Sequence, residues 1–417
     1  MDDVIVIGAG PAGLLAAYIA GRRGARVRVL ASGIGTTHIM PGWLGVLRTT
    51  GAEQSLPAAL EGWTAAHPEH PYALAGLNAL HQGISVLREI CAPVGVSYVG
   101  DLQTNLILPT ALGATMQAAL APESFAAGDL RTPGEMLIAG PEGWRDFFPR
   151  LCAENLARQG YTARGVTFPM PETTTGRFDM TPVGLARLFE QPPVRERVAG
   201  YLTARLGGAT RVGLPAVIGL ERHAEAWHHL QDRLGVPLFE VATLPPSVPG
   251  MRLFNAFKGA LARVGVPLLL DMPVARGVVE GRRAVGVVVP NPSREATYRA
   301  GEVILATGGL YGGGITTNHR GEMRETIFGL PLNVPGDPGD WFDATFLSGR
   351  SHPIHLAGVR VSASMQPVDE AGRGIMEQES TLCTNVRVAG RLLAGYDPQR
   401  EGSTEGVWLA TAHRAAS

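Results

Sequence analysis

Three glycines near the N-terminus have the spacing of a phosphate-binding turn, Gly8-x-Gly10-x-x-Gly13. In such a turn the first glycine permits a tight change of direction, and the second leaves the backbone open to a pyrophosphate. The third glycine lets a helix pack closely on a strand, and that helix offers unpaired N–H groups and a partial positive charge to the phosphate. We therefore predict a nucleotide cofactor site here, with contacts from Gly8, Gly10, Pro11, Ala12 and Gly13.

The elements expected around this turn form one β-α-β unit. Val4–Ile7 is a short apolar run typical of a buried parallel strand, residues 14–23 have helical character, and Val27–Leu30 predicts a second strand. An acidic residue usually ends that second strand and binds the adenosine ribose, but Ala31 stands there. Its absence argues against ordinary NAD binding and permits either a smaller nucleotide or a modified dinucleotide site.

Two further signals come later in the chain. The predicted strand Val303–Leu305 leads into Ala306-Thr307-Gly308-Gly309, an element that resembles the apolar strand and Ala-Thr-Gly of flavoproteins with two dinucleotide-binding folds. Near the C-terminus, a predicted strand ends at Gly390, and a glycine-containing loop leads to a helix expected over residues 406–416. We predict that Thr307, Gly308, Gly390 and Gly406 also contact the cofactor.

Two charged residues do not fit the usual flavin site at the C-terminus. Arg391 follows Gly390 where an acidic residue is expected, and Glu405 lies near the start of the last helix. A carboxylate at that position would repel a reduced flavin anion.

Length and composition predict an α/β protein with a Rossmann-like FAD/NAD(P)-binding fold, a parallel sheet and an inserted α+β middle domain. The 417 residues are 45% hydrophobic and 18% charged, enough apolar material for a large core. We expect the flavin-binding domain to comprise residues 1–50, 245–330 and 380–417. The inserted domain is expected over 51–244, and 331–379 is expected to be a loop-rich connection.

The charge pattern and the cysteines exclude several classes of function. The net charge is −1 and no basic block occurs, so a nucleic-acid partner is not expected. No secretory signal and no apolar stretch of membrane-spanning length is visible, which predicts a cytoplasmic protein. Cys91, Cys152 and Cys383 are too few and too scattered for a disulfide framework, and we expect buried thiols.

No metal site and no catalytic residue are assigned from the sequence. His67-x-x-His70 and His352-x-x-His355 have ligand-like spacing, but both lie beside prolines and lack an acidic or cysteine partner at metal spacing. Four residues could bind an anionic substrate or move a proton, although we favour surface or salt-bridged roles for each of them. They are Arg252, His319, Arg324 and Arg360.

Four stretches in this order resemble the B subunit of the anaerobic glycerol-3-phosphate dehydrogenases over nearly the full length: HPEHPY at 67–72, TLPPSVPGMR at 243–252, ATGG at 306–309 and AGYDP at 394–398. The resemblance implies an FMN cofactor, with FAD as the alternative, and oxidation of sn-glycerol 3-phosphate to dihydroxyacetone phosphate with electrons passed to the quinone pool. It also implies two partners, a catalytic flavoprotein (the A subunit) and an iron–sulfur protein (the C subunit) that anchors the complex at the inner face of the membrane. The less glycine-rich loop at 402–406 departs from the family.

Two other interpretations remain open at this stage. The chain could be a stand-alone FAD-dependent reductase or dehydrogenase of the fumarate-reductase type. It could also be a degenerate flavoprotein with a structural role in a complex, an interpretation that Ala31, Arg391 and Glu405 keep open.

Overall fold

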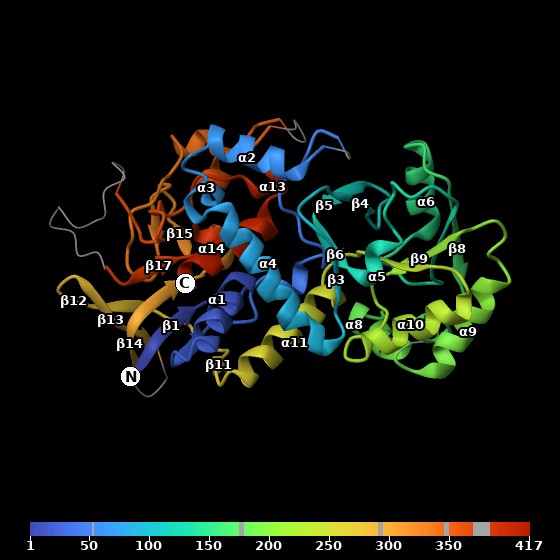
Figure 1. Cartoon of the computed structure of the whole chain (residues 1–417), viewed down its shortest axis with the longest axis horizontal. Coiled ribbons are helices and arrows are strands. Elements are labelled where there is room, and N and C mark those ends of the chain that lie inside the picture. The colour runs from blue at the N-terminus through green and yellow to red at the C-terminus, as the bar shows by residue number, and fades with distance from the viewer. Residues whose placement is uncertain (52–53, 175–178, 291–294, 346–349, 370–383) are drawn as a thin grey trace.

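The structure is a computed structural model that describes residues 1–51, 54–174, 179–290, 295–345, 350–369 and 384–417. It has two parts, a larger one built from both ends of the chain and a smaller one built from its middle (Figure 1). In the described ranges, no helix combines the length and the apolar composition that a membrane crossing requires.

A seven-stranded sheet forms the centre of the larger part. Its strand order is β11-β2-β1-β14-β13-β12, with β17 beside the C-terminal half of β14. β1 pairs in parallel with β2 and β14, whereas β12, β13 and the first half of β14 form an antiparallel meander. The strands are β1 (Asp2–Ile7), β2 (Val27–Leu30), β11 (Leu268–Leu269), β12 (Arg276–Glu280), β13 (Arg283–Val289), β14 (Ala296–Leu305) and β17 (Val386–Val388).

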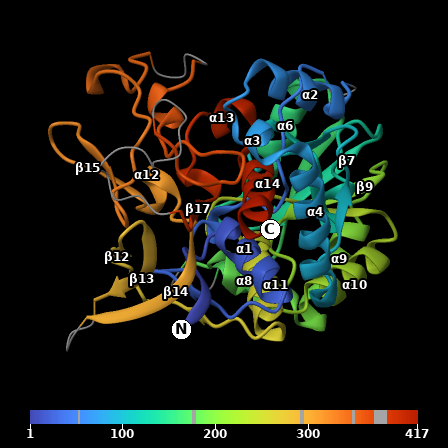
Figure 2. The same ribbon diagram turned by 60° about the vertical axis from the view of Figure 1, so that its left-hand side comes forward.

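Four helices pack together beside this sheet. α1 contacts both α14 and α11, and α4 contacts both α14 and α11, so the first and last helices of the chain are neighbours (Figure 2). Their buried side chains join those of the sheet in one hydrophobic core. The helices are α1 (Pro11–Arg22), α4 (Leu77–Cys91), α11 (Val248–Arg263) and α14 (Thr404–Ala416).

The smaller part is a four-stranded parallel sheet of order β10-β9-β7-β8 with its own hydrophobic core. Strands and helices alternate along the chain, as parallel pairing requires, because each strand must be followed by a crossover. The elements are β7 (Met136–Pro141), α6 (Pro149–Arg158), β8 (Ala163–Phe168), α8 (Pro182–Phe189), α9 (Pro192–Thr203), β9 (Arg211–Pro215), α10 (His223–Leu234) and β10 (Leu238–Val241).

Short elements complete the fold. The strand pairs β3–β6, β4–β5 and β15–β16 are antiparallel. These strands are β3 (Tyr98–Gly100), β6 (Leu120–Pro122), β4 (Leu106–Pro109), β5 (Thr115–Ala118), β15 (Ile315–Thr317) and β16 (Met323–Glu325). The remaining α-helices are α2 (Leu56–Ala66), α3 (Pro71–Ala75), α5 (Glu123–Ala126), α7 (Pro171–Thr174), α12 (Gly309–Gly312) and α13 (Pro398–Glu401). The 3₁₀ turns are η1 (Thr37–Ile39), η2 (Ala92–Val94), η3 (Pro338–Asp340), η4 (Pro353–Leu356) and η5 (Gly390–Leu392).

The Rossmann-like fold with a parallel sheet is confirmed, and the middle of the chain is more regular than expected. Its main sheet is wholly parallel, so the α+β description suits only the small antiparallel pairs beside it. The division at residue 51 stays a prediction. Buried residues from 56 to 102 belong to the larger core, and those of the second core begin at Leu130. Cys91 and Cys152 are free and buried as expected, and Cys383 lies outside the described residues.

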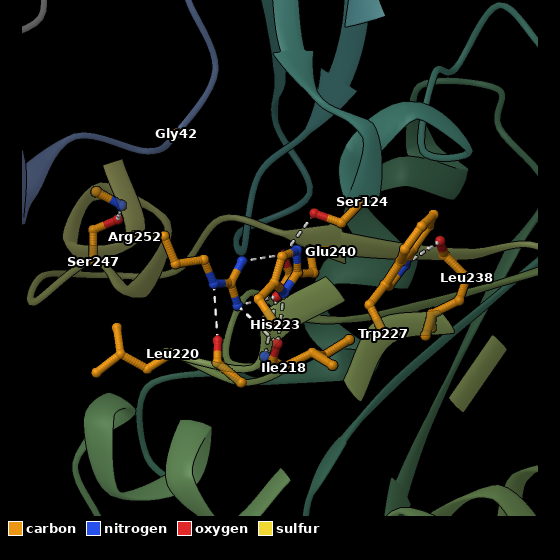
Figure 3. A network of polar contacts seen from close by, with 12 residues as sticks. Gly42, Ser124, Ile218, Leu220, His223, Trp227, Leu238, Glu240, Ser247 and Arg252 are labelled. Atoms are coloured by element: carbon orange, nitrogen blue, oxygen red, sulfur yellow. Dashed lines mark hydrogen bonds and ion pairs between the residues drawn. The ribbon is translucent and has the colours of Figure 1, made fainter. Parts of the chain in front are cut away.

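A buried ion pair joins the two parts. Arg252, on the first turns of α11, donates to Glu240 at the end of β10 through both terminal nitrogens, at 2.7 and 2.9 Å (Figure 3). Its guanidinium also donates to the carbonyls of Gly219 and Ile218, at 2.8 and 3.1 Å. Arg252 is therefore a structural residue that ties the helix of one part to the sheet of the other.

The charges around Glu240 fix its ionisation. Burial alone would raise the pKa of the Glu240 carboxyl, but the Arg252 guanidinium and the N–H of Ile218 hold it below its usual value. Burial, assisted by Arg252, lowers the pKa of His223 to about 4, so this histidine is neutral at pH 7. The pair is consequently charged at physiological pH, and its net benefit depends on both members being present.

We predict that Arg252→Met lowers the free energy of unfolding by about 3–5 kcal/mol, because it leaves Glu240 charged and unpaired in the interior. Urea titration of the purified variant measures the change. Arg145→Met is the matched control, since Arg145 forms an exposed pair with Asp179 and should cost less than about 1 kcal/mol. Equal losses of unfolding free energy in the two variants would show that the buried pair stabilises the fold no more than an exposed pair.

Candidate functional site

The predicted phosphate-binding turn lies where β1, α1 and β14 approach one another. Gly8 adopts φ +112°, and a side chain on it would overlap the Ala306 carbonyl. A side chain on Gly13 would overlap the carbonyl of Gly8. These two glycines are therefore required by packing, and they bring the backbone of α1 directly over the ends of the two central strands.

Gly10 has a different role from its neighbours. It is the N-cap of α1, it has extended backbone angles, and a Cβ built on it meets nothing within 4 Å. A side chain at Gly10 would therefore point into open space, although Gly35 packs against its backbone from another side, and the first turn of α1 has no side-chain cap and no acidic residue. Bare N–H groups and the positive end of the helix dipole are thus presented to the space beyond Gly10.

That space is a cleft with two lobes that share lining residues Gly10, Thr36, Ala306 and Gly308. The lobe beside the end of β2, called here the β2 lobe, has a volume of about 470 Å³. The lobe beside the start of α14, called here the α14 lobe, has a volume of about 460 Å³. The cleft therefore lies along the carboxyl ends of the parallel strands, the usual position for ligands in such sheets.

The structure places the predicted contact residues as follows. Gly8, Thr307 and Gly308 line the β2 lobe, Pro11, Ala12, Gly308 and Gly390 line the α14 lobe, and Gly10 lines both. Gly13 and Gly406 line neither lobe. Gly406 is packed against the Tyr72 hydroxyl and the backbone of Val46, so its lack of a side chain serves packing.

Two orphaned polar groups indicate that a ligand belongs in the cleft. The buried hydroxyl of Thr307, in the β2 lobe, and the buried indole N–H of Trp408, in the α14 lobe, have no hydrogen-bond partner in the described part of the chain. A buried polar group without a partner is costly, and a bound molecule that supplies one removes the penalty. Together with the bare turn at Gly10, these groups fit a long phosphate-bearing cofactor.

The family-like stretches 67–72 and 394–398 meet at the start of α13 and α14. The His70 ring lies 3.0 Å from the Glu401 carboxylate, and the Tyr72 hydroxyl donates to the Val46 carbonyl at 2.6 Å. Tyr396 lines the α14 lobe, and Asp397 is the N-cap residue of α13. The third family-like stretch, 243–252, supports the 3₁₀ turn η1. The Ser247 N–H donates to the His38 carbonyl at 2.7 Å, and Gly250 packs on Thr37. It thereby holds η1, whose Ile39 lines the α14 lobe.

Glu405 lines the α14 lobe from the first turn of α14, and its carboxylate accepts a hydrogen bond from the Gly45 N–H at 3.0 Å. Burial raises the pKa of Glu405 to about 7, and the N–H groups of Gly45 and of Glu405 itself offset only part of this effect. The carboxyl is therefore largely neutral below pH 7, which relieves the repulsion of a reduced flavin that the sequence suggested.

The other candidates separate clearly. Arg324 lines the β2 lobe, Arg360 lies outside the cleft and donates to Asn333 at 2.8 Å, and His319 is exposed. Among the described residues, no three His, Cys, Asp or Glu side chains are grouped to hold a metal ion. Sequence reasoning missed His355, Asp397 and Trp408 as site residues. Only His355 had been singled out, and then for its spacing to His352.

Comparison with known proteins now identifies the class and the family. Residues 3–407 match the FAD binding domain family, so the chain belongs to this family of flavoproteins. It also belongs to the family formed by the B subunits of anaerobic glycerol-3-phosphate dehydrogenases. A probable member from Halobacterium salinarum is 30% identical over 100% of this chain and 97% of the relative.

A second named relative agrees with this family. The B subunit from Yersinia enterocolitica is 28% identical over 98% of this chain and 96% of its own length. Among solved structures, a flavocytochrome c3 fumarate reductase is 11% identical over 100% of this chain and 77% of its own, with a TM-score of 0.45.

We predict that Gly10→Val folds normally but does not retain flavin, because the new side chain projects into the cleft where the phosphate would lie. The flavin absorbance per protein of the purified variant tests this. Gly13→Ala is the contrasting variant, since its methyl group overlaps the Gly8 carbonyl and should lower stability. Full flavin content in Gly10→Val would refute the placement of the phosphate.

We also predict that Glu405→Gln becomes more stable relative to the wild type as pH rises from about 4.5 to about 7. The folded pKa is raised, so the folded state holds the extra proton and loses stability as pH rises through this window. Relative to its value at pH 4.5, the stability of Glu405→Gln minus that of the wild type should rise by about 3 kcal/mol above pH 7. Thermal midpoints of both proteins at pH 5, 6, 7 and 8 measure it, and a gap independent of pH would contradict the assignment.

Proposed function

We propose that this chain is the flavin-dependent B subunit of an anaerobic glycerol-3-phosphate dehydrogenase complex. The reaction is oxidation of sn-glycerol 3-phosphate to dihydroxyacetone phosphate, with the electrons passed to the quinone pool. The full-length match to a relative that bears this subunit's name carries the proposal. The bare, two-lobed cleft supports it, because a degenerate protein with a purely structural role would have no need to keep such a space open.

We propose FAD as the cofactor in place of FMN. The β2 lobe is as large as the α14 lobe, and an isoalloxazine with a single phosphate would leave one of the two largely unfilled. Ala31 and Ser32 line the β2 lobe where a carboxylate usually binds the ribose, so the adenosine half would depend on other contacts. Arg324 lines the same lobe, and its cationic side chain could supply such a contact to the adenosine half.

The residues of the cleft have separable roles in this proposal. The first turn of α1 binds the pyrophosphate, and the Thr307 hydroxyl and the Trp408 indole N–H each gain a partner from the cofactor. Ile39, Met40 and Pro41 give the α14 lobe an apolar wall. The bound flavin supplies the redox chemistry, accepting two electrons from a substrate and releasing them to an acceptor.

We propose that the partners are a catalytic flavoprotein, the A subunit, and an iron–sulfur protein, the C subunit, which attaches the complex to the membrane. The relatives are named as the B subunit of an enzyme, and this supports a complex of several chains. In such a complex this protein would either bind substrate itself or relay electrons between its partners.

We predict that the purified full chain is yellow and releases FAD on denaturation, identified by chromatography. With sn-glycerol 3-phosphate and an artificial electron acceptor, the chain together with the subunits that copurify with it should reduce the acceptor. Released FMN would overturn the proposed cofactor. A colourless protein would favour the degenerate flavoprotein, and activity of the isolated chain on a small unsaturated acid would favour the fumarate-reductase type.

A further inference from the structure

We propose that His355, oriented by Asp397, accepts the substrate proton in the α14 lobe, and that Arg391 binds the anionic group of a small secondary alcohol beside it. The inference rests on the proposed function and gives this chain its own substrate site. It assigns the proton and anion roles to residues other than the four that the sequence offered for them.

His355 belongs to η4 and lines the α14 lobe. Its Nδ1 lies 3.2 Å from Asp397 Oδ1, and the two side chains are only 12% and 6% exposed. No hydrogen bond joins Nε2 of His355 to any residue in the described ranges. The ring is therefore fixed at one nitrogen and available at the other.

Asp397 is held rigidly in its place. Its Oδ1 accepts from the N–H groups of Gln399 and Arg400, at 3.0 and 3.2 Å, and its Oδ2 accepts from the Ser351 hydroxyl. Burial alone would raise the pKa of Asp397, but the Ser351 hydroxyl and the N–H groups of Arg400 and Gln399 hold it below its usual value. Asp397 is thus a carboxylate at neutral pH.

A carboxylate at this distance selects the histidine tautomer. It can only accept a hydrogen bond, so Nδ1 of a neutral His355 carries the hydrogen and Nε2 keeps its lone pair. A histidine held this way is a competent general base, because the same carboxylate stabilises the imidazolium that forms when Nε2 takes a proton.

Arg391 supplies the positive charge next to this base. It lines the α14 lobe, its Nη2 donates to the His355 carbonyl at 2.9 Å, and its guanidinium lies 5.2 Å from the Tyr396 ring. Within the described residues, no carboxylate lies within ion-pair distance of it. A guanidinium held by a carbonyl and a ring, without an acidic partner, is suited to a phosphate or carboxylate group of a ligand.

The chemistry balances with a flavin as the electron acceptor. Oxidation of a secondary alcohol to a ketone breaks the C–H and O–H bonds and forms the second C–O bond. The hydride, with its electron pair, leaves the carbon for the flavin, and the hydroxyl proton goes to Nε2 of His355. Arg391 beside this base selects alcohols that carry an anionic group, which is the class of glycerol 3-phosphate.

The test uses the flavin-loaded full chain with the subunits that copurify with it, and sn-glycerol 3-phosphate as the probe. His355→Gln should lower kcat by about 10²–10⁴-fold while flavin content and calorimetric affinity for the probe stay at wild-type values. His355→Gly should regain activity when imidazole is added, which a structural role would not produce. Asp397→Asn, a change at a positioning residue, should lower kcat with little effect on affinity.

Arg391→Met should instead lower the affinity for the probe, by about 10- to 100-fold, and change kcat little. Arg391→Lys should lower the affinity less. His67→Gln is the matched control, since this exposed histidine stacks on Trp63 away from the cleft lining and should leave both constants unchanged. Wild-type turnover that survives His355→Gln within threefold would overturn the inference and leave the proposed function standing. Absence of both binding and turnover in the wild type would overturn the proposed substrate itself.

Discussion

The close approach of three backbones at the end of the central strands is the constraint on which the rest of the molecule depends. Gly8 and Gly13 bring α1 onto β1, and Gly8 also contacts the Ala306 carbonyl at the end of β14. With side chains at these positions, α1 would be displaced from the sheet. The cleft beyond Gly10 exists because the contact is close on one side of the turn and open on the other.

This constraint explains how distant parts of the chain share one cleft. β14 enters the sheet beside β1 in the register Ile7–Leu305, which sets Gly8 next to Ala306 and Thr307. β17 pairs on the other side of β14, and so delivers Gly390 and Arg391 to the same edge. The middle of the chain must then leave and return without disturbing this edge. The Arg252–Glu240 pair holds α11, where the chain re-enters the larger part, against β10 of the smaller part. The start of α11 in turn supports η1 over the α14 lobe.

The parts of this arrangement that the sequence predicted are those with local signals. The turn 8–13, the element 306–309 and the last helix each combine an apolar strand or helix pattern with glycines at fixed spacing. The parallel sheet of the smaller part was missed, because β7 and β8 are short runs whose period does not separate strand from helix. Arg252 was an open choice between ligand and ion pair, since its partner Glu240 lies on a strand that was not predicted. The His355–Asp397 pair was missed for a related reason: 42 residues separate its members, and no local pattern joins them.

Two carboxyl groups near the α14 lobe show why residue type alone does not give the charge of a site. Asp397 receives two backbone N–H groups and a hydroxyl and faces a histidine, so it stays ionised despite its burial. Glu405 is partly buried in the lining of the lobe, and the few N–H groups around it only partly offset the loss of water, so its pKa rises to about 7. A sequence with an acidic residue in the first turn of α14 suggests that the positive helix end is neutralised toward the lobe. Because Glu405 is largely uncharged below pH 7, that end keeps its potential, and the positive charge of Arg391 adds to it. The lobe therefore suits molecules that carry or acquire negative charge, and it owes this to differences in solvation and partners rather than to the number of acidic residues.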